Sequence, residues 1–373
     1  MRKQSRAVVL KGPGSLEMKS FPIPVIGEDE GLLEVELVGV CGSDPAIYSG
    51  RSTRGPRPYP IILGHEIVGR VVEMGEIARK RRGLELGDRV VLEYAFGCGS
   101  CEMCLSGSYT LCDANFTYGS MISCKEPPHL FGGYSDYVYI HPRAMVHKLG
   151  EEVSPEVGVL VCAVLGNAIR WLRHKGGVSI GDSVVIIGPG QQGLAGVAVA
   201  REAGAEPVVV VGLERDAPRL AMARELGAHL TVNLEKQDPV QEVAEVTDGK
   251  MAKVVMDVSG SPGGACLAIA LAGKKATVVL PGIYKKEVSL ALDQVVFKEL
   301  RLLGVFSHDF QAVGPAVKMA RQGKYPLDRL VSHRFPLEEA ERALRLVAGQ
   351  EPGEMPLKVV LDPRLEAAGF SGQ

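Results

Sequence analysis

The sequence predicts an α/β protein that contains a doubly wound parallel sheet together with a second, β-rich region. From residue 183 to residue 282, short and almost entirely apolar strands alternate with helical stretches, which is typical of a parallel sheet covered on both faces. The first 150 residues hold short β-branched runs separated by glycine and proline, which is typical of an irregular β-rich domain. A length of 373 residues is enough for two such domains, each with its own core.

Composition excludes several classes of protein. Hydrophobic residues make up 46% and charged residues 23% of the chain, as in ordinary globular proteins, so disordered and collagen-like chains are excluded. The formal net charge is −2, so no basic field favours nucleic acid or an anionic membrane, and we expect neither as a partner. The N-terminus lacks the apolar stretch of a secretory signal, which predicts a cytoplasmic protein with reduced thiols.

In the first region, the β-branched runs predict strands at 7–10, 32–40, 67–72, 89–92 and 134–140. The basic run at 79–82 is short and ends at a glycine, so we interpret it as a solvated surface loop. Residues 157–169 form the longest apolar stretch, which is too short to span a bilayer and predicts a buried helix.

The second region predicts strands at 184–187, 207–212, 231–233, 253–260 and 276–282, with helices at 191–204, 217–227, 239–246 and up to residue 271. The remaining tail has helical stretches at 312–322 and 337–348 and a strand at 357–361. It is too small to fold alone, so we expect it to pack on the first domain. The expected division is 1–156, 157–304 and 305–373, with the third segment completing the first.

A glycine-rich loop follows the strand at 184–187 and opens a helix. It reads G-x-G-x-x-G, formed by Gly188, Pro189, Gly190, Gln191, Gln192 and Gly193. The first glycine permits a tight turn, the second lets the backbone approach a pyrophosphate, and the third lets helix and strand pack closely. In this strand-turn-helix context the motif predicts a dinucleotide site.

The choice between NAD and NADP stays open. An acidic residue at the end of the next strand would hold the ribose hydroxyls of NAD, and Glu214 lies 21 positions after Gly193. The usual spacing falls near Gly212, however, and Gly212 followed by Arg215 equally suits the 2′-phosphate of NADP.

Four of the eight cysteines form a cluster. Cys98, Cys101, Cys104 and Cys112 have the spacing C-x2-C-x2-C-x7-C, which suits four thiolates around one tetrahedral zinc with no position left for a substrate. An iron–sulfur cluster and unliganded thiols are the alternatives. Ferredoxin sequences place their fourth cysteine sooner and follow it with proline, so the spacing favours a structural zinc.

A second candidate site joins two strand ends. Cys41, Ser43 and Asp44 follow one predicted strand, and His65 and Glu66 begin another. Cys41 and His65 together suit an ion, with Ser43 near its open face and Asp44 orienting His65. Cys124 and Cys266 belong to no motif, and we interpret them as packing residues.

Taken together, the motifs CGSD, GHEIVGRVVEMG, GDRVV, the four-cysteine segment, GGYSDYV, GPGQQG and LKVVLDP occur in the order of one known family. The sequence resembles the zinc-dependent medium-chain dehydrogenase/reductase superfamily, which includes alcohol, sorbitol and threonine dehydrogenases. The resemblance implies a GroES-like catalytic domain interrupted by a Rossmann domain, with a second, catalytic zinc.

By this resemblance, Cys41 and His65 ligate the catalytic zinc, Glu66 sits beside it and can ligate it, and Ser43 passes the substrate proton. The resemblance also implies that Arg219 lies near the adenosine ribose and that Lys358 reaches the pyrophosphate. The implied reaction moves a hydride between an alcohol or polyol and NAD(P), with the metal acting as a Lewis acid. Dimers or tetramers are implied through the last Rossmann strand, near residues 300–306.

The chain departs from the family pattern at two positions. Ala46 stands where the family often has the histidine that ends the proton relay, so the relay must use water or another group. Ala163 aligns with the remaining zinc ligand, beside Cys162, so Cys162, Glu66 or no further protein group completes the shell. Glu66 is favoured, because neighbouring helix residues point about 100° apart.

Two alternatives to a zinc alcohol dehydrogenase are a zinc-free quinone or enoyl reductase of the same superfamily and a non-catalytic dinucleotide-binding redox sensor. The first usually lacks both the CGSD cysteine and the four-cysteine segment, whereas Ala46 and Ala163 lend weight to the second. The sequence leaves open which of a few candidate residues face the substrate. They are Ile47, Tyr48, Tyr94, Trp171 and His308.

Overall fold

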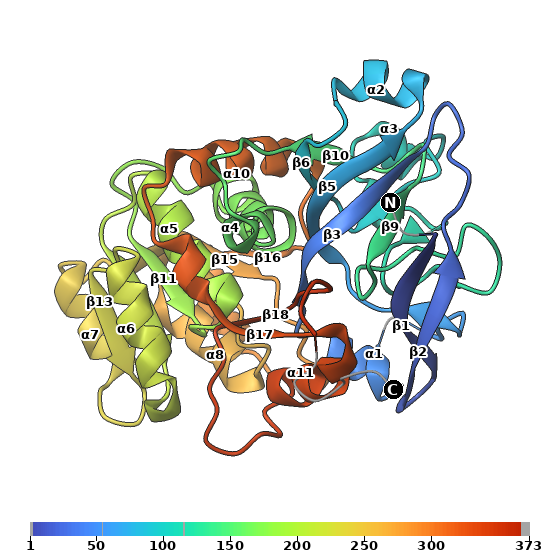
Figure 1. Cartoon of the computed structure of the whole chain (residues 1–373). Helices are drawn as coiled ribbons and strands as arrows, with labels where there is room; N and C mark the ends of the chain where they lie inside the picture. Colours follow the sequence, from blue (N-terminus) through green and yellow to red (C-terminus); the bar gives the residue numbers. More distant parts are fainter. Residues whose placement is uncertain (1–2, 54, 115, 367–373) are drawn as a thin grey trace. The chain divides into compact units, whose positions relative to one another are not determined.

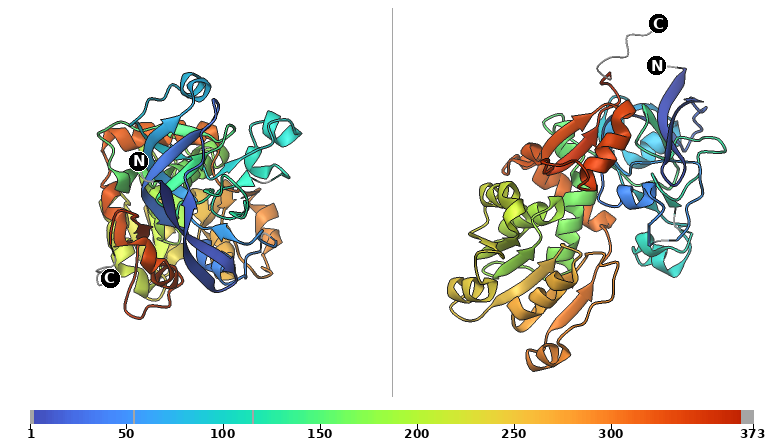
Figure 2. Two further views of the ribbon diagram at one scale, coloured as in Figure 1. Left: turned by 45° about the vertical axis from the view of Figure 1, so that its right-hand side comes forward. Right: turned by 90° about the horizontal axis from the view of Figure 1, so that it is seen from below.

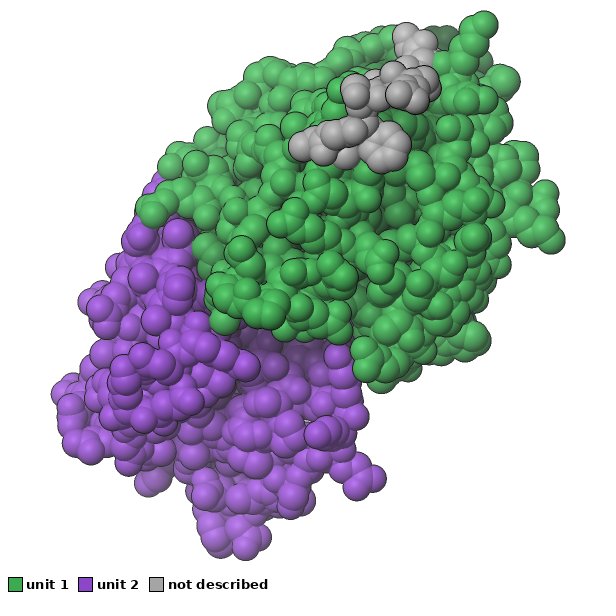
Figure 3. Space-filling model, turned by 60° about the horizontal axis from the view of Figure 1, so that its bottom comes forward, with its two compact units in different colours: residues 1–163, 317–323, 327–373 green, residues 164–316, 324–326 purple. Residues whose placement is uncertain are grey.

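The structure is a computed structural model that describes residues 3–53, 55–114 and 116–366. The chain forms two compact units, which Figure 3 shows in different colours. The first unit comprises residues 1–163, 317–323 and 327–373, and the second comprises 164–316 and 324–326. The expected division differs at both ends, because residues 157–163 belong to the first unit and residues 305–316 to the second.

The first unit is built mainly from β-strands, which carry the β-branched runs of the sequence (Figure 1). Its strands are β1 (Gln4–Gly12), β2 (Ser15–Pro22), β3 (Gly31–Val40), β4 (Ile61–Ile62), β5 (Glu66–Met74), β6 (Arg89–Leu92), β7 (Ala95–Phe96), β8 (Phe116–Thr117), β9 (Tyr137–Ile140), β10 (Val146–Lys148), β17 (Val331–Phe335) and β18 (Lys358–Leu361). Its short helices are α1 (Asp44–Tyr48), α2 (Glu76–Arg82), α3 (Glu102–Leu105), η1 (Tyr109–Leu111), α4 (Pro155–Gly158), η5 (Leu327–Leu330), η6 (Leu337–Glu339) and α11 (Ala340–Val347).

The main sheet of this unit has the order β10-β6-β5-β3-β18-β17, and β9 also pairs with β3. The antiparallel pairing of β18 with β3 brings the C-terminal tail into the sheet of the first region. The tail therefore contributes β17 and β18 to a core that also includes β1, β3, β5 and β6.

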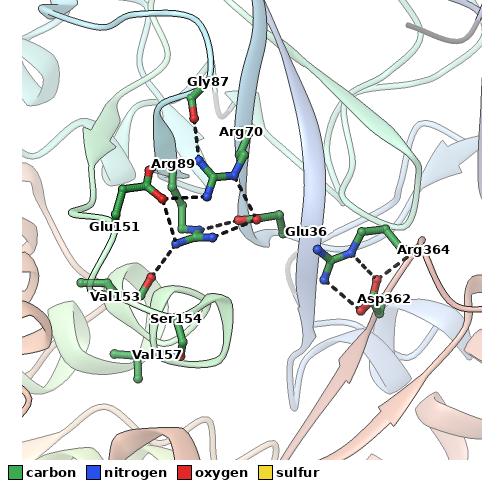
Figure 4. A network of polar contacts seen from close by, with 10 residues as sticks. All are labelled: Glu36, Arg70, Gly87, Arg89, Glu151, Val153, Ser154, Val157, Asp362 and Arg364. Atoms are coloured by element: carbon green, nitrogen blue, oxygen red, sulfur yellow. Dashed lines mark hydrogen bonds and ion pairs between the residues drawn. The ribbon is translucent and has the colours of Figure 1, made fainter.

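A buried ionic network ties three of these strands together (Figure 4). The carboxylate of Glu36 accepts hydrogen bonds from Arg89 Nε at 2.6 Å and Arg89 Nη2 at 3.1 Å, and from Arg70 Nε at 3.3 Å. Arg89 Nη1 also donates to the carbonyl of Val153 at 2.9 Å, and Arg70 pairs with Glu151. Because Glu36 and Arg89 are both buried, the pair satisfies charges that would otherwise be costly inside the protein.

The second unit contains one parallel sheet with helices between its strands. Its strands are β11 (Val184–Ile187), β12 (Val208–Gly212), β13 (Leu230–Asn233), β14 (Ala252–Asp257), β15 (Ala272–Leu280) and β16 (Arg301–Gly304). Its helical segments are η3 (Ile169–Lys175), α5 (Gln191–Glu202), η4 (Glu214–Asp216), α6 (Ala217–Glu225), α7 (Pro239–Val246), α8 (Pro262–Leu271) and α9 (Leu292–Phe297). All five strand pairs are parallel, in the order β13-β12-β11-β14-β15-β16.

This order is the doubly wound arrangement of dinucleotide-binding domains, in which the first strand, β11, lies at the centre and successive strands are added first on one side of it and then on the other. Figure 2 shows most of this unit in colours from green through yellow to orange. The predicted α/β fold class is confirmed. The apolar side chains of β11, β12, β14 and β15 form the core of the sheet, as their continuous apolar runs predict.

The apolar stretch predicted as a short buried helix is longer than expected. Helical structure runs from Pro155 to Lys175, which is long and apolar enough by length and composition to cross a membrane. Most of it is buried, however: 83% of its most apolar window lies inside the protein, as in the core helix of a globular fold. Burial, and not length, therefore argues for a core helix. It contains two π-helical parts, η2 (Val161–Gly166) and η3.

The basic run is a helix and not a loop. Helix α2 ends at Gly83, whose φ of 62° is the left-handed conformation that closes helices. Lys80 pairs with Glu76 one turn earlier, and Arg82 donates to the carbonyls of His141 and Ala144. The basic side chains of Lys80 and Arg82 therefore bind to a carboxylate and to backbone carbonyls.

Helix α10 (Phe310–Gln322) contains residues of both units.

Candidate metal centres and coenzyme loop

The first candidate site forms where two antiparallel strands begin and end. Gly39 of β3 lies opposite Glu66 of β5, so Cys41, just after β3, meets His65, just before β5. One ligand atom each of Cys41, His65 and Glu66 lies within 4.8 Å of the others. The register of two strands, and not spacing along the chain, therefore brings together the three donors that the sequence indicated.

A glycine at position 64 is required for this arrangement. Its φ is +88°, and a Cβ atom there would lie 2.3 Å from the ring of Tyr134. A larger residue would both strain the backbone and displace Tyr134, which helps to hold the site.

Asp44 supports the donors without belonging to their group. Its Oδ2 atom accepts the backbone N–H of Cys41 at 3.0 Å and the hydroxyl of Tyr134 at 3.1 Å, and its Oδ1 atom lies 3.4 Å from His65 Nδ1. These contacts leave His65 Nε2 for an ion, as in metal sites where a carboxylate orients the histidine. The prediction that Asp44 orients His65 thus agrees with this geometry.

The same neighbours shift the protonation of His65. Burial would lower its pKa, but Asp44 and then Cys41 outweigh burial and hold the pKa of His65 well above its ordinary value. A protonated imidazole cannot ligate a metal, so an ion that binds here must displace that proton.

Glu66 has one oxygen committed and one available. Its Oε2 atom pairs with the ammonium of Lys358, and both side chains are fully buried. Its Oε1 atom is buried and has no hydrogen-bond partner among the described residues. A buried and unpartnered carboxylate oxygen beside a thiol and an imidazole is the donor set that suits zinc, so the residues fit the ion that the resemblance implies.

Lys358 forms a buried ion pair within the first unit. Its side chain has no exposed surface, and its Nζ also donates to the carbonyl of Val40 at 3.4 Å. A Cβ atom on Gly39 would lie 2.7 Å from Lys358 Cε, so this glycine makes room for the pair. The ammonium of Lys358 is thus paired with Glu66 in this structure, and its contact with a coenzyme pyrophosphate stays a prediction.

The surroundings of the donors include residues whose position the sequence left open. The ring of Tyr94 meets that of His65 edge-on, with centroids 6.1 Å apart. Tyr48 instead points its hydroxyl to Glu341 at 2.9 Å. Sequence reasoning missed Tyr134 as a functional residue, because its partner Asp44 is 90 residues away and no local spacing signals the contact.

The proton-relay candidate Ser43 lies at the start of α1. Its side chain is exposed, and its carbonyl accepts the N–H groups of Ala46 and Ile47 at 3.1 Å. The hydroxyl is therefore open to solvent two residues after Cys41.

The four-cysteine segment closes on itself. The Sγ atoms of Cys98 and Cys104 lie 3.9 Å apart, and those of Cys101 and Cys112 lie 3.8 Å apart. Four sulfurs about 2.3 Å from a tetrahedral zinc would be separated by about 3.8 Å, so the residues fit this ion. None of the eight cysteines, all in the described part of the chain, forms a disulfide.

Backbone donors favour the thiolate form of Cys98 in this segment. Hydrogen bonds from Ser100, and then from Cys101, lower the pKa of Cys98 to about 5. Burial instead raises the pKa of Cys104 to about 12, so a metal that binds this segment must displace a proton from that thiol.

The glycine-rich loop has the geometry expected of a dinucleotide site. Gly188 has a φ of +99°, and a Cβ atom on Gly193 would lie 2.0 Å from the carbonyl oxygen of Gly188. A Cβ on Gly190, in contrast, would have no atom of the described residues within 4 Å, so the open approach is at this glycine. Helix α5 begins at Gln191 without a side-chain cap, so its first backbone N–H groups have no side-chain acceptor at the cap position, which fits a bound pyrophosphate.

The two predicted ribose contacts have protein partners. The carboxylate of Glu214 accepts from Asn233 and from Lys236, the latter at 2.7 Å, both beyond or at the end of β13. Arg219 Nη1 lies 3.2 Å from Asp216 Oδ1. Gly212 ends β12, and a Cβ atom there would lie 2.9 Å from Pro189 of the loop.

Comparison with known proteins gives the same picture. Residues 27–151 match the family described as an alcohol dehydrogenase GroES-like domain, and residues 193–322 match the zinc-binding dehydrogenase family. The chain is 39% identical over 371 residues to a probable alcohol dehydrogenase of Mycobacterium tuberculosis, covering 96% of this chain and 98% of that one. It is 30% identical over 374 residues to an erythritol/L-threitol dehydrogenase of Mycolicibacterium smegmatis, covering 97% and 98%.

Among solved structures, an alcohol dehydrogenase of Thermotoga maritima is similar with a TM-score of 0.88 and 30% identity, covering 96% of this chain and 99% of that one. These proteins give no support to a zinc-free reductase or to a non-catalytic sensor. The chain therefore belongs to the zinc-dependent medium-chain dehydrogenase/reductase superfamily and is an NAD(P)-dependent oxidoreductase of the alcohol dehydrogenase type.

Proposed function

We propose that the protein oxidises an alcohol or polyol at a zinc held by Cys41, His65 and Glu66, with NAD(P) held at the loop of residues 188–193. The observation that carries this proposal is the buried Oε1 atom of Glu66, which has no partner among the described residues and lies within 4.8 Å of ligand atoms of Cys41 and His65. When bound, zinc supplies Lewis-acid polarisation of the substrate oxygen and the coenzyme accepts the hydride.

The chain's own residues then have distinct tasks. Asp44 orients His65 and holds the backbone of Cys41. The exposed hydroxyl of Ser43 takes the substrate proton and passes it to solvent, because Ala46 has no group that can receive it. Lys358 neutralises one oxygen of Glu66, so that Glu66 offers a single oxygen to the metal.

Glu66 is a better third ligand than Cys162. Cys162 lies in the π-helical part η2, where each turn holds about one residue more than in an α-helix. The direction of its side chain therefore differs from that in a regular α-helix, and helix register alone does not exclude Cys162 as a ligand. Its thiol, however, is outside the group of donors that lie within 4.8 Å of one another. Burial, followed by the carboxylates of Glu93 and Glu66, also raises the pKa of Cys162 well above its usual value, which disfavours a thiolate.

Metal content tests the proposal directly. The purified protein should hold close to two zinc ions per chain, one for each donor group. Cys41→Ser should lose one zinc together with activity on alcohols, Cys101→Ser should lose the other, and Cys266→Ser, at an exposed cysteine outside both groups, should keep both. A single zinc that is retained in Cys41→Ser would refute a catalytic zinc at this site.

For the coenzyme, the proposed preference is NADP over NAD. Gly212 offers no carboxylate to a ribose, and Pro189 leaves little room for one there. Glu214 is engaged by Lys236, whereas Arg215 is exposed, and an arginine just after this strand supports binding of a 2′-phosphate. Arg215→Gln should lower kcat/KM for NADP and leave that for NAD unchanged, and a wild-type preference for NAD would contradict the assignment.

A homodimer or homotetramer in the cytoplasm completes the proposal. Within the described part of the chain, β16 pairs only with β15, and the neighbouring α9 exposes Leu292, Val296 and Phe297. An unpaired edge beside an apolar surface supports association of two copies. Light scattering should show an oligomer that Phe297→Glu dissociates.

Eight free cysteines support a reducing compartment, which microscopy of the tagged protein would test.

A further inference from the structure

One segment of the first unit, beside the proposed zinc site, carries only positive charge. Residues 45–65 contain arginines at positions 51, 54 and 57 and no lysine, aspartate or glutamate, although the whole chain has a net charge of −2. The segment lies in sequence between Ser43 and His65, so it connects the two halves of the proposed zinc site.

The structure keeps Arg51 close to this site. Helix α1 follows Ser43 directly, and the backbone N–H of Arg51 donates to the carbonyl of Ala46 at 2.9 Å. At a rise of about 1.5 Å per residue, this turn holds the Cα atoms of Ser43 and Arg51 within about 12 Å. The side chain of Arg51 is exposed, and its Nε donates to Ser49 Oγ at 3.1 Å.

Arg57 folds back over the same segment. Its Nη2 atom donates to Ser52 Oγ at 2.5 Å, and its Nη1 atom lies 2.7 Å from the sulfur of Met121. The hydroxyl of Tyr59 contacts the carbonyl of Ile47 in α1 at 3.5 Å. The later part of the segment, at Tyr59, therefore lies against α1. The guanidinium groups of Arg51 and Arg57 lie among hydroxyl groups and a thioether.

We propose that the substrate is an alcohol that carries a phosphate monoester, whose dianion is bound by Arg51 and Arg57 while its hydroxyl carbon is oxidised at the zinc site. This rests on the proposed function. Guanidinium groups present paired donors that match phosphate oxygens, and hydroxyl groups such as that of Thr53 add further donors. No acidic residue within the segment competes for the two arginines.

Steady-state kinetics on matched substrates test this assignment. A polyol, its terminal phosphate monoester and a hydroxycarboxylate of the same length are compared, with inorganic phosphate as a competing anion. The wild type should favour the phosphate ester by at least about tenfold in kcat/KM, mainly through KM. Arg51→Gln and Arg57→Gln should each remove about tenfold of this preference, leave the neutral polyol unchanged and weaken inhibition by phosphate.

Two further variants separate recognition from structure. Arg51→Lys keeps the charge and should recover part of the lost preference. Arg81→Gln removes an exposed arginine of the same unit that pairs with Asp29, and it should behave as the wild type. Thermal unfolding of each variant shows whether the fold is intact.

Failure of this inference is distinct from failure of the proposed function. Zinc-dependent turnover of the neutral polyol, with no preference for the phosphate ester and no effect of Arg51→Gln, would overturn the inference alone. A preference for the hydroxycarboxylate would also overturn the assignment of phosphate. Absence of turnover together with absence of the second zinc would instead overturn the proposed function.

Discussion

Asp44→Asn tests whether the contacts around His65 prepare it for a metal. The substitution keeps the size of the side chain but replaces one oxygen with an NH₂ group. The backbone N–H of Cys41 can only donate, so the remaining oxygen of the amide is needed there, at the place now taken by Oδ2 of Asp44. The NH₂ group then faces Nδ1 of His65.

That orientation reverses the tautomer of the imidazole. With a donor opposite, Nδ1 becomes an acceptor and the proton moves to Nε2, the nitrogen that the metal needs. Loss of an outer carboxylate of this kind typically lowers metal affinity by about 10- to 100-fold, which corresponds to about 1.4 to 2.7 kcal/mol. Because Asp44 is fully buried, water cannot replace the lost oxygen, and we expect the upper part of this range.

Competition with a chromophoric chelator measures the effect. The zinc of the four-cysteine segment serves as an internal standard, since Cys98 and its partners make no contact with Asp44 among the hydrogen bonds of the described residues. The weaker of the two zinc sites should become about 10- to 100-fold weaker in Asp44→Asn and stay unchanged in Asp293→Asn, at an exposed aspartate of the second unit. Two zinc affinities equal to those of the wild type would refute the role of Asp44.

Three further predictions concern stability, the coenzyme and pH. Glu36→Leu leaves the guanidinium of Arg89 buried without its carboxylate, so urea denaturation should show that the free energy of unfolding falls by about 3 to 5 kcal/mol. The double variant Glu36→Leu/Arg89→Met should largely recover this loss. Additive losses would contradict the coupling of the two residues. Gly193→Ala places a Cβ atom 2.0 Å from the carbonyl oxygen of Gly188, so coenzyme titration should show an affinity loss of at least about tenfold. Gly263→Ala is the control: its added Cβ has no atom of the described residues within 4 Å, so coenzyme affinity should stay unchanged. The raised pKa of His65 means that zinc must displace a proton from the imidazole, in addition to the proton of the Cys41 thiol. The affinity of this site should therefore fall by at least about tenfold per pH unit as pH decreases from about 8 to 6, and a flat profile would argue against His65 as a ligand.

Features encoded by local spacing could be predicted from the sequence. The glycine loop, the four-cysteine segment and the alternating strands and helices of the second unit each depend on residues close together in the chain. Helix α7 (Pro239–Val246) has the bounds that the pattern predicts. Local periodicity fixes such elements because each makes its own hydrogen bonds before any distant contact forms.

Predictions were less accurate where packing overrides local signals. The helix of residues 155–175 exceeds the predicted 157–169 because burial on most of its surface favours helix through Glu156 and Arg170, which appeared to close it. The run at 79–82 is helical because Gly75 and Gly83 close its ends and carboxylates and carbonyls pair its charges.

The sequence by itself determined the fold class, the coenzyme loop and which residue types would meet a metal. Only the tertiary structure decided how Cys41, His65 and Glu66 meet, since the pairing of Gly39 with Glu66 sets their register. The structure also decided that Lys358 pairs with Glu66, because β18 pairs beside β3 and buries that side chain against a partner 292 residues away in the chain. Such contacts between distant strands leave no periodic or spacing signal along the chain, which is why they appear only when the sheet is assembled.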